Sequence, residues 1–473
     1  MNISVIGAGY VGLVSAACFA ELGHTVIGVD NDPAKLLALE EGRVPIHESL
    51  LPELLQRHLG QRLTFTDSIA RAVRASDVVF ITVGTPSSVT GDADLCYVEA
   101  VIREVARHIT SKKLIVEKST VPVRTCDSIR RTMELNGAPP HLFSVASNPE
   151  FLREGTAVTD FLYPDRIVAG VDDAFSEDKL RQIYAPLWGG SYYRRDDLVP
   201  GDDSALPRFI VTNTKSAELI KHTSNAFLAM KISFMNAIAN IAERVGGDID
   251  QIKEGVGSDS RIGASFLNAG IGYGGSCFPK DVLAFRAVAR DAGYDFDLLD
   301  SVMRINQDQR NQFLRKVREA LWTLRNKRIA VLGLAFKAGT DDVRESPAIE
   351  IVKALIKEGC HITAFDPVAM PRALEEIQAR AGEGSIEMAS DAYAAAEDAD
   401  AVLILTEWSE FASLDLRKLR RKMRLPVIID GRNLYRPEEM DAAGFVYYSI
   451  GRTPVFPVER VNPTLELVFE EIA

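Results

Sequence analysis

The N-terminal part of the chain alternates short apolar runs with longer stretches whose apolar residues recur at helical spacing. Runs of this length are typical of buried strands, and the stretches between them are typical of helices. Strands that alternate with helices favour a parallel sheet covered on both faces. The predicted strands are Ile3–Ile6, Thr25–Val29, Val78–Val83, Leu114–Val116 and Phe143–Ala146, and the predicted helices include Val11–Leu22 and Asp94–Ile109.

The C-terminal third of the chain repeats the same order of elements. Its apolar runs lie 326, 336 and 323 residues after their N-terminal counterparts, so the spacing is also kept. We therefore predict an α/β fold with two doubly wound, Rossmann-like domains. The paired segments are Asn2–Gly7 with Arg328–Leu334, Thr25–Asp30 with His361–Asp366, and Asp77–Thr82 with Asp400–Thr406.

Two further segments lie between the repeated parts. Thr214–Gly246 carries apolar residues at helical spacing without a proline, which predicts one long helix. We expect this helix to bridge the two domains and to form a subunit interface in a homodimer or larger homo-oligomer. The preceding segment, Ser191–Arg208, is polar and contains Gly, Pro and Asp, so we expect a surface loop or hairpin there.

Composition and charge narrow the class of protein. The 473 residues are 47% hydrophobic and 25% charged, which is an ordinary globular balance. A net charge of −12 makes nucleic acid a poor candidate partner. No apolar run approaches the ~20 residues of a membrane helix, and the N-terminus lacks a signal-peptide pattern. Five scattered cysteines without a CxxC pair indicate neither a disulfide framework nor a metal site, so we expect a cytoplasmic protein.

The hexapeptide GAGYVG at 7–12 follows a predicted strand and opens a predicted helix, as a dinucleotide-binding loop does. In such a loop Gly7 allows the tight turn, Gly9 lets the backbone approach a pyrophosphate, and Gly12 lets the helix pack against the strand. Asp30 ends the second strand, where a carboxylate would bind a ribose 2′-hydroxyl and repel a 2′-phosphate. We therefore predict NAD rather than NADP as the cofactor.

The C-terminal copy of this loop keeps only one of the glycines. After its first strand the chain reads Gly333-Leu334-Ala335-Phe336-Lys337, which cannot cradle a pyrophosphate in the same way. Lys337 could instead meet a phosphate as a point charge. We infer that the second domain binds a different ligand from the first.

A glycine-rich decapeptide, GYGGSCFPKD at 272–281, contains a single cysteine. Pro279 and Asp281 suit the start of a helix, which would place Cys277 near the positive end of a helix dipole and favour its thiolate. A buried, inert thiol is the alternative, and we keep that interpretation for the other four cysteines. A thiolate beside NAD can add to an aldehyde, and the adduct can be oxidised to a thioester that water hydrolyses. The pattern thus predicts oxidation of an aldehyde to an acid.

Taken together, these motifs resemble those of the UDP-glucose/GDP-mannose dehydrogenase family along nearly the whole chain. The resemblance implies oxidation of the C6 alcohol of UDP-glucose to a carboxylate with two NAD⁺. It also implies three domains: NAD-binding (1–212), central and helical (213–325), and UDP-binding (326–473). The segments that carry it are GAGYVG (7–12), VGTPS (83–87), EKSTVPV (117–123), NPEFLREGTAV (148–158), ELIKHTSNAFLAMKISFMN (218–236), FLNAGIGYGGSCFPKD (266–281), GLAFKAGTDDVRESPA (333–348) and DGRN (430–433).

The resemblance implies a role for three residues at the reacting carbon. Cys277 matches the family's nucleophile, which carries the thioester. Lys221 and Asn225 lie four residues apart, on one face of the long helix, and match the residues that contact the C6 oxygen. From residue type alone, Lys221 would be an ordinary solvated lysine, and only the motif overturns that interpretation.

The remaining implied contacts surround the catalytic water, the cofactor and the substrate. Asp281 matches the carboxylate that holds the water and the lysine, and Thr120 and Glu150 match the polar pair around that water. From sequence alone, Glu150 could equally be a carboxylate in the first turn of a helix. The implied NAD contacts are Gly7, Gly9, Val11, Gly12, Asp30, Lys35, Thr85, Thr120, Glu154, Lys280 and Arg344. The implied substrate contacts are Phe151, Leu152, Arg153, Glu154, Lys221, Asn225, Phe266, Leu267, Asn268, Ala269, Gly270, Gly274, Lys337 and Arg432, with Arg261 reaching the substrate of a neighbouring subunit.

Three alternatives compete with this interpretation. The substrate could be GDP-mannose or a UDP-N-acetylhexosamine, although RIGASFLNAGIGYGG resembles the UDP-glucose branch. A hydroxyacid dehydrogenase would make a single oxidation, and Cys277 in its full motif argues against it. An inactive nucleotide-sugar binder would lack Cys277, Lys221 or Asp281, and all three are present. Tyr10, inside the glycine loop, is expected to pack rather than to take part in chemistry.

Overall fold

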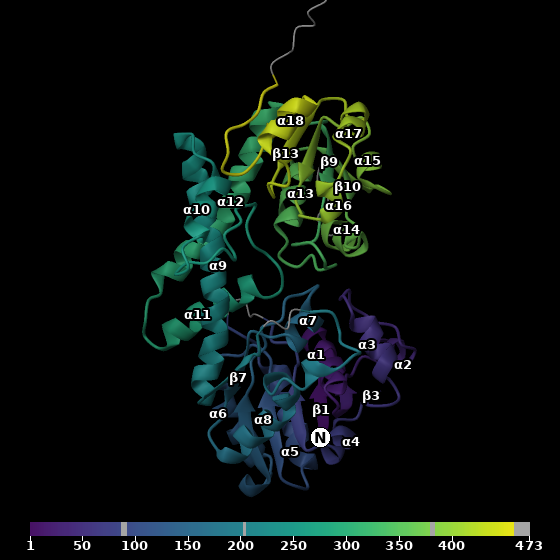
Figure 1. Ribbon diagram of the computed structural model, residues 1–473, viewed down its shortest axis with the longest axis vertical. Helices are drawn as coiled ribbons and strands as arrows, with labels where there is room; N and C mark the ends of the chain where they lie inside the picture. Colours follow the sequence, from purple (N-terminus) through teal and green to yellow (C-terminus); the bar gives the residue numbers. More distant parts are fainter. Residues whose placement is uncertain (87–91, 202–204, 379–383, 458–473) are drawn as a thin grey trace, which may run out of the picture. The chain divides into compact units, whose positions relative to one another are not determined.

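The structure is a computed structural model that describes residues 1–86, 92–201, 205–378 and 384–457. The chain forms two compact units, each with its own parallel sheet (Figure 1). Unit 1 comprises Met1–Met230, Ser276–Ser301 and Gly339–Asp341, and unit 2 comprises Lys231–Gly275, Val302–Ala338 and Asp342–Ala473.

The sheet of unit 1 has the strand order β3-β2-β1-β4-β5-β6-β7-β8 among the described residues. Neighbouring strands pair in parallel except β6 and β7, which are antiparallel through Ser147 and Gly170. The first six strands follow the 3-2-1-4-5-6 order of doubly wound dinucleotide-binding folds. The bounds are β1 (Asn2–Ile6), β2 (Thr25–Val29), β3 (Leu63–Thr66), β4 (Val78–Ile81), β5 (Lys113–Glu117), β6 (Phe143–Ser147), β7 (Arg166–Gly170) and β8 (Arg208–Thr212).

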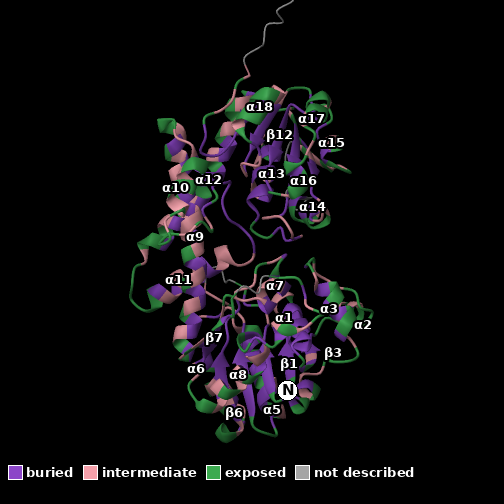
Figure 2. Cartoon of the chain, viewed as in Figure 1, coloured by how far each residue is buried: buried purple, intermediate pink, exposed green. Residues whose placement is uncertain are grey.

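Helices cover both faces of this sheet, so its central strands have no face toward solvent. Every residue of β4 and β5 is buried, and Figure 2 shows purple, buried strands in the middle of this unit. Continuous apolar runs are typical of strands buried on both faces. The helices of unit 1 are α1 (Tyr10–Glu21), α2 (Pro33–Glu40), α3 (Leu51–His58), α4 (Ile69–Ala75), α5 (Cys96–His108), α6 (Thr125–Leu135), α7 (Ala157–Leu162), α8 (Ala174–Trp188) and α11 (Phe278–Asp291).

The sheet of unit 2 has the order β11-β10-β9-β12-β13-β14, entirely parallel, which is again 3-2-1-4-5-6. The predicted pair of doubly wound, Rossmann-like domains is therefore confirmed. The strands are β9 (Arg328–Leu332), β10 (His361–Phe365), β11 (Ser385–Met388), β12 (Ala401–Ile404), β13 (Val427–Asp430) and β14 (Val446–Tyr448). The helices are α10 (Ile249–Gly257), α13 (Pro347–Lys357), α14 (Met370–Gln378), α15 (Ala392–Ala395), α16 (Ser409–Ala412), α17 (Leu416–Lys422) and α18 (Pro437–Ala443).

The long central helix is confirmed. Helix α9 (Thr214–Val245) is continuous over 32 residues and contributes residues to both units, as does α12 (Asp297–Leu321). Within the described helices, none combines the length and the apolar character needed to cross a membrane. The same part of the chain contains no group of three or more His, Cys, Asp or Glu side chains placed to hold a metal ion.

Most described residues of 191–208 are irregular and at least partly exposed, as expected for a surface loop, but one part near its start is packed. A short 3₁₀ helix, Tyr192–Arg194, begins there, and the Tyr192 side chain is 1% exposed against Tyr163. Arg195 then forms an ion pair with the fully buried carboxylate of Glu21 (Nη2–Oε1, 3.1 Å). The polar sequence concealed this packing because a single aromatic ring and one arginine carry it. Residues 202–204 of the segment lie outside the described residues.

Candidate active site

The glycine loop has the shape that a dinucleotide pyrophosphate requires. Gly7 adopts φ +103°, and a Cβ on Gly12 would lie 1.7 Å from the carbonyl oxygen of Gly7. A Cβ on Gly9 would meet nothing within 4 Å, so the backbone at Gly9 is open to an approaching ligand. Helix α1 begins at Tyr10, which directs its first amides toward this opening. The implied contact Val11 lies in the same turn.

Asp30 is held as a carboxylate beside this loop. Its Oδ2 accepts hydrogen bonds from the Ala8 amide (2.9 Å) and from Nζ of Lys35 (2.8 Å), and its Oδ1 accepts one from the Asp32 amide (3.1 Å). Burial alone would raise the pKa of Asp30, but Lys35 and the two amides outweigh it and lower the pKa. A negative charge therefore stands at the end of β2, where it would repel a 2′-phosphate.

The matching position of unit 2 is already filled. Asp366 is fully buried, and its Oδ2 accepts hydrogen bonds from the amides of Leu334 (2.8 Å) and Ala335 (3.1 Å) and from Nε1 of Trp408 (3.2 Å). Asp366 accepts five hydrogen bonds in all, against three at Asp30, so it is less able to accept a further one from a ribose hydroxyl. The geometry agrees with the expectation that the second domain binds a different ligand from the first.

Four of the predicted catalytic side chains form two buried pairs in unit 1. Nζ of Lys221 donates to Oε1 of Glu150 (2.9 Å), and Nδ2 of Asn225 donates to Oδ2 of Asp281 (2.6 Å). Lys221 and Asn225 lie one turn apart on α9, Asp281 lies in the first turn of α11, and Glu150 follows β6. Burial alone would lower the pKa of Lys221, but Glu150 and Asp281 outweigh it and raise the pKa. The raised pKa favours the ammonium form of Lys221 at neutral pH.

Cys277 lies immediately before α11, where the sequence placed it, but its expected thiolate is wrong for the resting enzyme. Burial, followed by the charges of Glu150 and Asp281, raises the pKa of the Cys277 thiol to about 11, and Lys221 opposes them only in part. Two carboxylates and a desolvated environment outweigh one ammonium and one helix end. The resting group at this position is a thiol.

Lys280 connects three of the implied cofactor and water contacts. Its Nζ donates to Oγ1 of Thr85 (3.2 Å), and Oγ1 of Thr85 donates to the carbonyl oxygen of Thr120 (2.9 Å). The same ammonium lies 3.2 Å from Oδ1 of Asp281. The segments that follow β4 and β5 are thus joined to Asp281 through Lys280.

The segment 151–154 follows Glu150 directly. The Phe151 ring lies under the guanidinium of Arg166 (3.9 Å to the ring centroid), and the Leu152 amide donates to Oε2 of Glu150 (2.5 Å). Arg153 pairs with Asp160, and Oε1 of Glu154 accepts a hydrogen bond from Oγ of Ser276 (2.9 Å), the residue before Cys277. Contacts of its backbone and side chains therefore hold the segment 151–154 beside Glu150 and Ser276.

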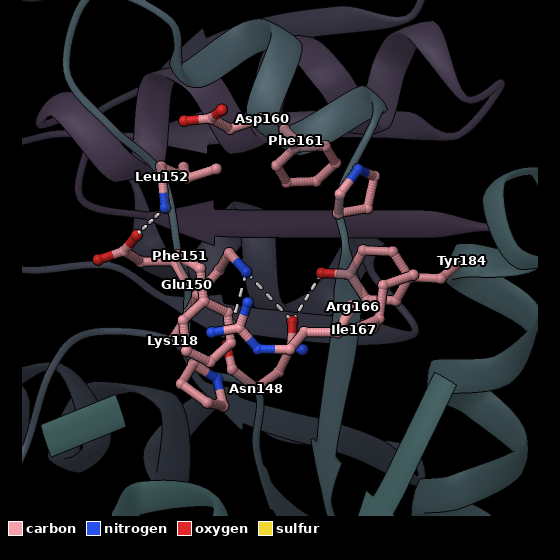
Figure 3. Close-up of a pocket in the computed structure, with 12 residues that line it drawn as sticks. Lys118, Asn148, Glu150, Phe151, Leu152, Asp160, Phe161, Arg166, Ile167 and Tyr184 are labelled. Carbon is pink, nitrogen blue, oxygen red and sulfur yellow. Dashed lines mark hydrogen bonds between the residues drawn. The ribbon is translucent and has the colours of Figure 1, made fainter. Parts of the chain in front are cut away.

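Lys118 is a residue of this site that the sequence did not single out. It is 4% exposed, and its Nζ donates to Oδ1 of Asn148 (3.2 Å), which also accepts from the Tyr184 hydroxyl (2.6 Å). Figure 3 shows these side chains and Glu150 around a cavity of about 40 Å³, enough for two or three water molecules at about 15 Å³ each. Burial lowers the pKa of Lys118 to about 8, with Glu150 opposing it. The sequence signal that could have indicated Lys118 is its position directly after the apolar run of a buried strand.

Within unit 2, several implied substrate residues gather where β9, β12 and β13 end. The Gly270 amide donates to Oδ1 of Asn236 (2.8 Å), and a Cβ on Gly270 would lie 3.4 Å from Nη1 of Arg432. Nη2 of Arg432 donates to the carbonyl oxygen of Phe336 (3.1 Å), next to Lys337. Of the neighbouring implied contacts, Leu267 and Ala269 are buried, Phe266 is half-buried, Asn268 is exposed, and a Cβ on Gly274 would meet a backbone oxygen at 2.2 Å.

Two further implied contacts form ion pairs with nearby aspartates. Arg344, in unit 2, pairs with Asp342 (2.7 Å), and Arg261 is 87% exposed and pairs with Asp259 (2.6 Å). The cofactor contact of Arg344 and the neighbouring-subunit contact of Arg261 stay predictions. Tyr10 packs against the core as expected, and its hydroxyl also donates to Glu48, which the sequence did not indicate.

Three domain profiles of one protein family match the chain. The NAD binding domain of the UDP-glucose/GDP-mannose dehydrogenase family matches residues 1–188, its central domain residues 215–308, and its UDP binding domain residues 330–437. UDP-glucose 6-dehydrogenase TuaD of Bacillus subtilis is 46% identical over 100% of this chain and 98% of its own. A UDP-glucose 6-dehydrogenase of Rhizobium meliloti is 46% identical over 96% of this chain and 100% of its own.

Solved structures show the same similarity. A UDP-glucose dehydrogenase from Pyrobaculum islandicum superposes with a TM-score of 0.84 at 38% identity, covering 95% of this chain and 97% of the other. A UDP-D-ManNAc dehydrogenase from Pyrococcus horikoshii superposes with a TM-score of 0.80 at 28% identity, covering 96% and 100%.

Proposed function

Because the chain belongs to the UDP-glucose/GDP-mannose dehydrogenase family, we propose that it oxidises UDP-glucose at C6 to UDP-glucuronate, with two NAD⁺ per sugar. The observation that carries the proposal is the buried cluster of Cys277, Lys221 and Asp281 in the unit that contains the glycine loop. UDP-glucose is favoured as the substrate because the relatives named for it are 46% identical, against 28% for the UDP-D-ManNAc dehydrogenase.

The glycine loop fits the cofactor, since the backbone at Gly9 is open to a pyrophosphate and the Asp30 carboxylate is hydrogen-bonded to the Ala8 amide of this loop. NAD, when bound, supplies the hydride acceptor for both oxidations. In the first oxidation, Lys221 stabilises negative charge on the C6 oxygen as its proton leaves. The raised pKa of Lys221 keeps this side chain an ammonium, so a carboxylate accepts the proton. We assign this role to Asp281, which accepts a hydrogen bond from Asn225.

The second oxidation needs a nucleophile. The Sγ–C6 bond forms as the thiol proton of Cys277 moves to the aldehyde oxygen, which gives a thiohemiacetal. Oxidation of this adduct, with loss of its hydroxyl proton, gives the thioester. A water positioned by Asp281, Thr120 and Glu150 then adds, the C–S bond breaks, and the carboxylate leaves as Cys277 regains a proton. The pKa of about 11 means that proton transfer accompanies the attack of the sulfur.

The decisive experiment counts the NADH formed per sugar for UDP-glucose, GDP-mannose and two UDP-N-acetylhexosamines. We expect two NADH per UDP-glucose and the highest kcat/KM for that substrate. Cys277→Ser should keep the affinity for both ligands and lose turnover to UDP-glucuronate by several orders of magnitude. A single NADH per sugar in the parent enzyme contradicts the thioester, and a preference for another nucleotide sugar contradicts the substrate.

We also propose a homodimer or larger assembly built on α9. Phe227, Phe234 and Ile241 recur every seven residues on this helix and are 56%, 58% and 56% exposed, which is unusual for large apolar side chains. Sedimentation at assay concentration should show a species of at least twice 51.9 kDa, and Phe234→Asp should shift it toward the monomer. An active monomer of the parent chain contradicts the proposal. The cytoplasmic location stays a prediction.

A further inference from the structure

Glu48 lies between the glycine loop and the segment in front of Cys277, and no motif pointed to it. The side chain is 4% exposed and comes from the stretch before α3. One carboxylate oxygen, Oε2, accepts from the Tyr10 hydroxyl and from the Gly155 amide (2.7 Å). The other, Oε1, accepts from the amides of Ala157 (2.7 Å) and Val158 (3.5 Å). A single carboxylate thus connects the first residue of α1 to the turn at Gly155 and to the first two amides of α7.

Glu154, the residue before this turn, contacts Ser276, the residue before Cys277. Gly155 adopts φ +85°, and a Cβ there would lie 2.5 Å from the carbonyl oxygen of Gly339, so the turn admits no other residue in this geometry. Glu154, immediately before it, accepts a hydrogen bond from Oγ of Ser276 (2.9 Å), and Oγ of Ser276 lies 3.5 Å from Sγ of Cys277. The contacts run without a break from Tyr10 through Glu48, Gly155 and Glu154 to the cysteine loop.

We propose that Glu48 is a positioning residue. It fixes Gly155 and the start of α7 relative to the dinucleotide loop and, through Glu154 and Ser276, helps to position Cys277. A buried carboxylate is expensive unless several donors satisfy it, and here four donors from two separate segments do so. Burial raises the pKa of Glu48 to about 7, opposed by the amides of Gly155, Val158 and Ala157. Glu48 contacts both the glycine loop and the segment that follows Glu154, so its loss should change the geometry of the site as well as local stability.

The role of Glu48 can be tested with one isosteric change. Glu48→Gln keeps the volume and one acceptor oxygen, but it turns an NH₂ group toward an amide that can only donate. We expect the Kd of NAD, titrated without sugar, to rise about fivefold or more, because Tyr10 loses its fixed partner at the start of α1. We expect kcat to fall at least tenfold with KM for UDP-glucose within twofold. Tyr10→Phe should give a smaller effect, and the double variant should resemble Glu48→Gln alone, since both act through one contact.

Glu53→Gln is the matched control, since it removes an exposed carboxylate five residues away. Thermal melting of each variant separates positioning from folding. If Glu48→Gln lowers Tm but leaves the Kd of NAD and kcat at control values below the transition, the role is structural and the proposal is wrong. The same conclusion follows if the Tyr10 and Glu48 effects simply add. The kinetic readout rests on the proposed function, whereas the NAD titration does not, so a parent enzyme inactive on UDP-glucose would leave the proposal testable by the titration.

Discussion

The reactivity of Cys277 should reveal that its resting state is a thiol. At pH 8 a group with a pKa of about 11 is ionised in roughly one molecule in a thousand, whereas an unperturbed cysteine with a pKa near 8.5 is ionised in about a quarter. The more basic thiolate is intrinsically about tenfold more nucleophilic, because reactivity rises with pKa at a slope of about 0.4–0.5. The two factors together predict alkylation by iodoacetamide roughly 20-fold slower than for a free thiol.

The pH dependence sharpens this prediction. The alkylation rate of Cys277 should rise about tenfold per pH unit from pH 7 to 10 without a plateau. Peptide-resolved mass spectrometry separates Cys277 from Cys96, which is the exposed cysteine of the described residues. A rate that levels off below pH 9 would show that the thiolate is stabilised at rest and would refute the electrostatic reasoning.

Two variants should move this rate in opposite directions. Asp281→Asn removes a negative charge that raises the pKa of Cys277, so alkylation at pH 8 should accelerate severalfold. Lys221→Met removes the cation that lowers it, so alkylation should slow. Asp291→Asn, on the exposed face at the end of the same helix, is the matched control and should leave the rate unchanged. Shifts of the same sign in both variants would mean that repacking, and not charge, governs the thiol.

Three further perturbations follow from the same geometry. Asp30→Asn should reduce the preference for NAD over NADP at least tenfold in kcat/KM, since one charge–charge repulsion is worth about 1.4 kcal/mol or more; an unchanged ratio would contradict the cofactor assignment. Glu117→Gln should raise the free energy of unfolding at pH 8 by a few kcal/mol and have little effect at pH 4, with Glu99→Gln as an exposed control. Burial raises the pKa of Glu117 to about 8, so between pH 4.5 and 8 only the unfolded chain loses this proton and stability falls as pH rises; equal effects at both pH values would contradict this. Lys118→Met should remove an ionisation near pH 8 from the pH profile of kcat, because the charge of the Lys118 ammonium acts on Glu150. An unaltered profile would exclude an influence of Lys118 on Glu150.

Four residues that the sequence assigned to catalysis form two hydrogen-bonded pairs within unit 1. Lys221 meets Glu150, and Asn225 meets Asp281, although each pair is more than fifty residues apart along the chain. Motif spacing could not reveal these partners, since a hydrogen bond across the fold leaves no local pattern. The resemblance supplied their grouping, and the contacts supply a physical reason for it: each buried charge or amide needs a partner.

Periodicity was sufficient for the architecture. Apolar runs, helical spacing and glycine turns are local properties, and they predicted two doubly wound domains, the long helix α9 and a helix that begins near Pro279. This reasoning did not predict strands β3, β7, β8, β11, β13 and β14. The sequence did not reveal that Tyr192 in the segment 191–208 is buried and that Arg195 pairs with Glu21, because both partners are distant in sequence.

Electrostatics depended on the assembled fold. The helix-end position of Cys277 was readable from Pro279 and Asp281, but the protonation of its thiol was not. Desolvation and the charges of Glu150 and Asp281 decide it, and these terms depend on distances that exist only once the chain has folded. The same holds for Glu48, an unremarkable acid in a loop whose four donors come from two other segments. Local pattern specifies which elements form, whereas burial and charge, which act through space, set the chemistry of the groups those elements carry.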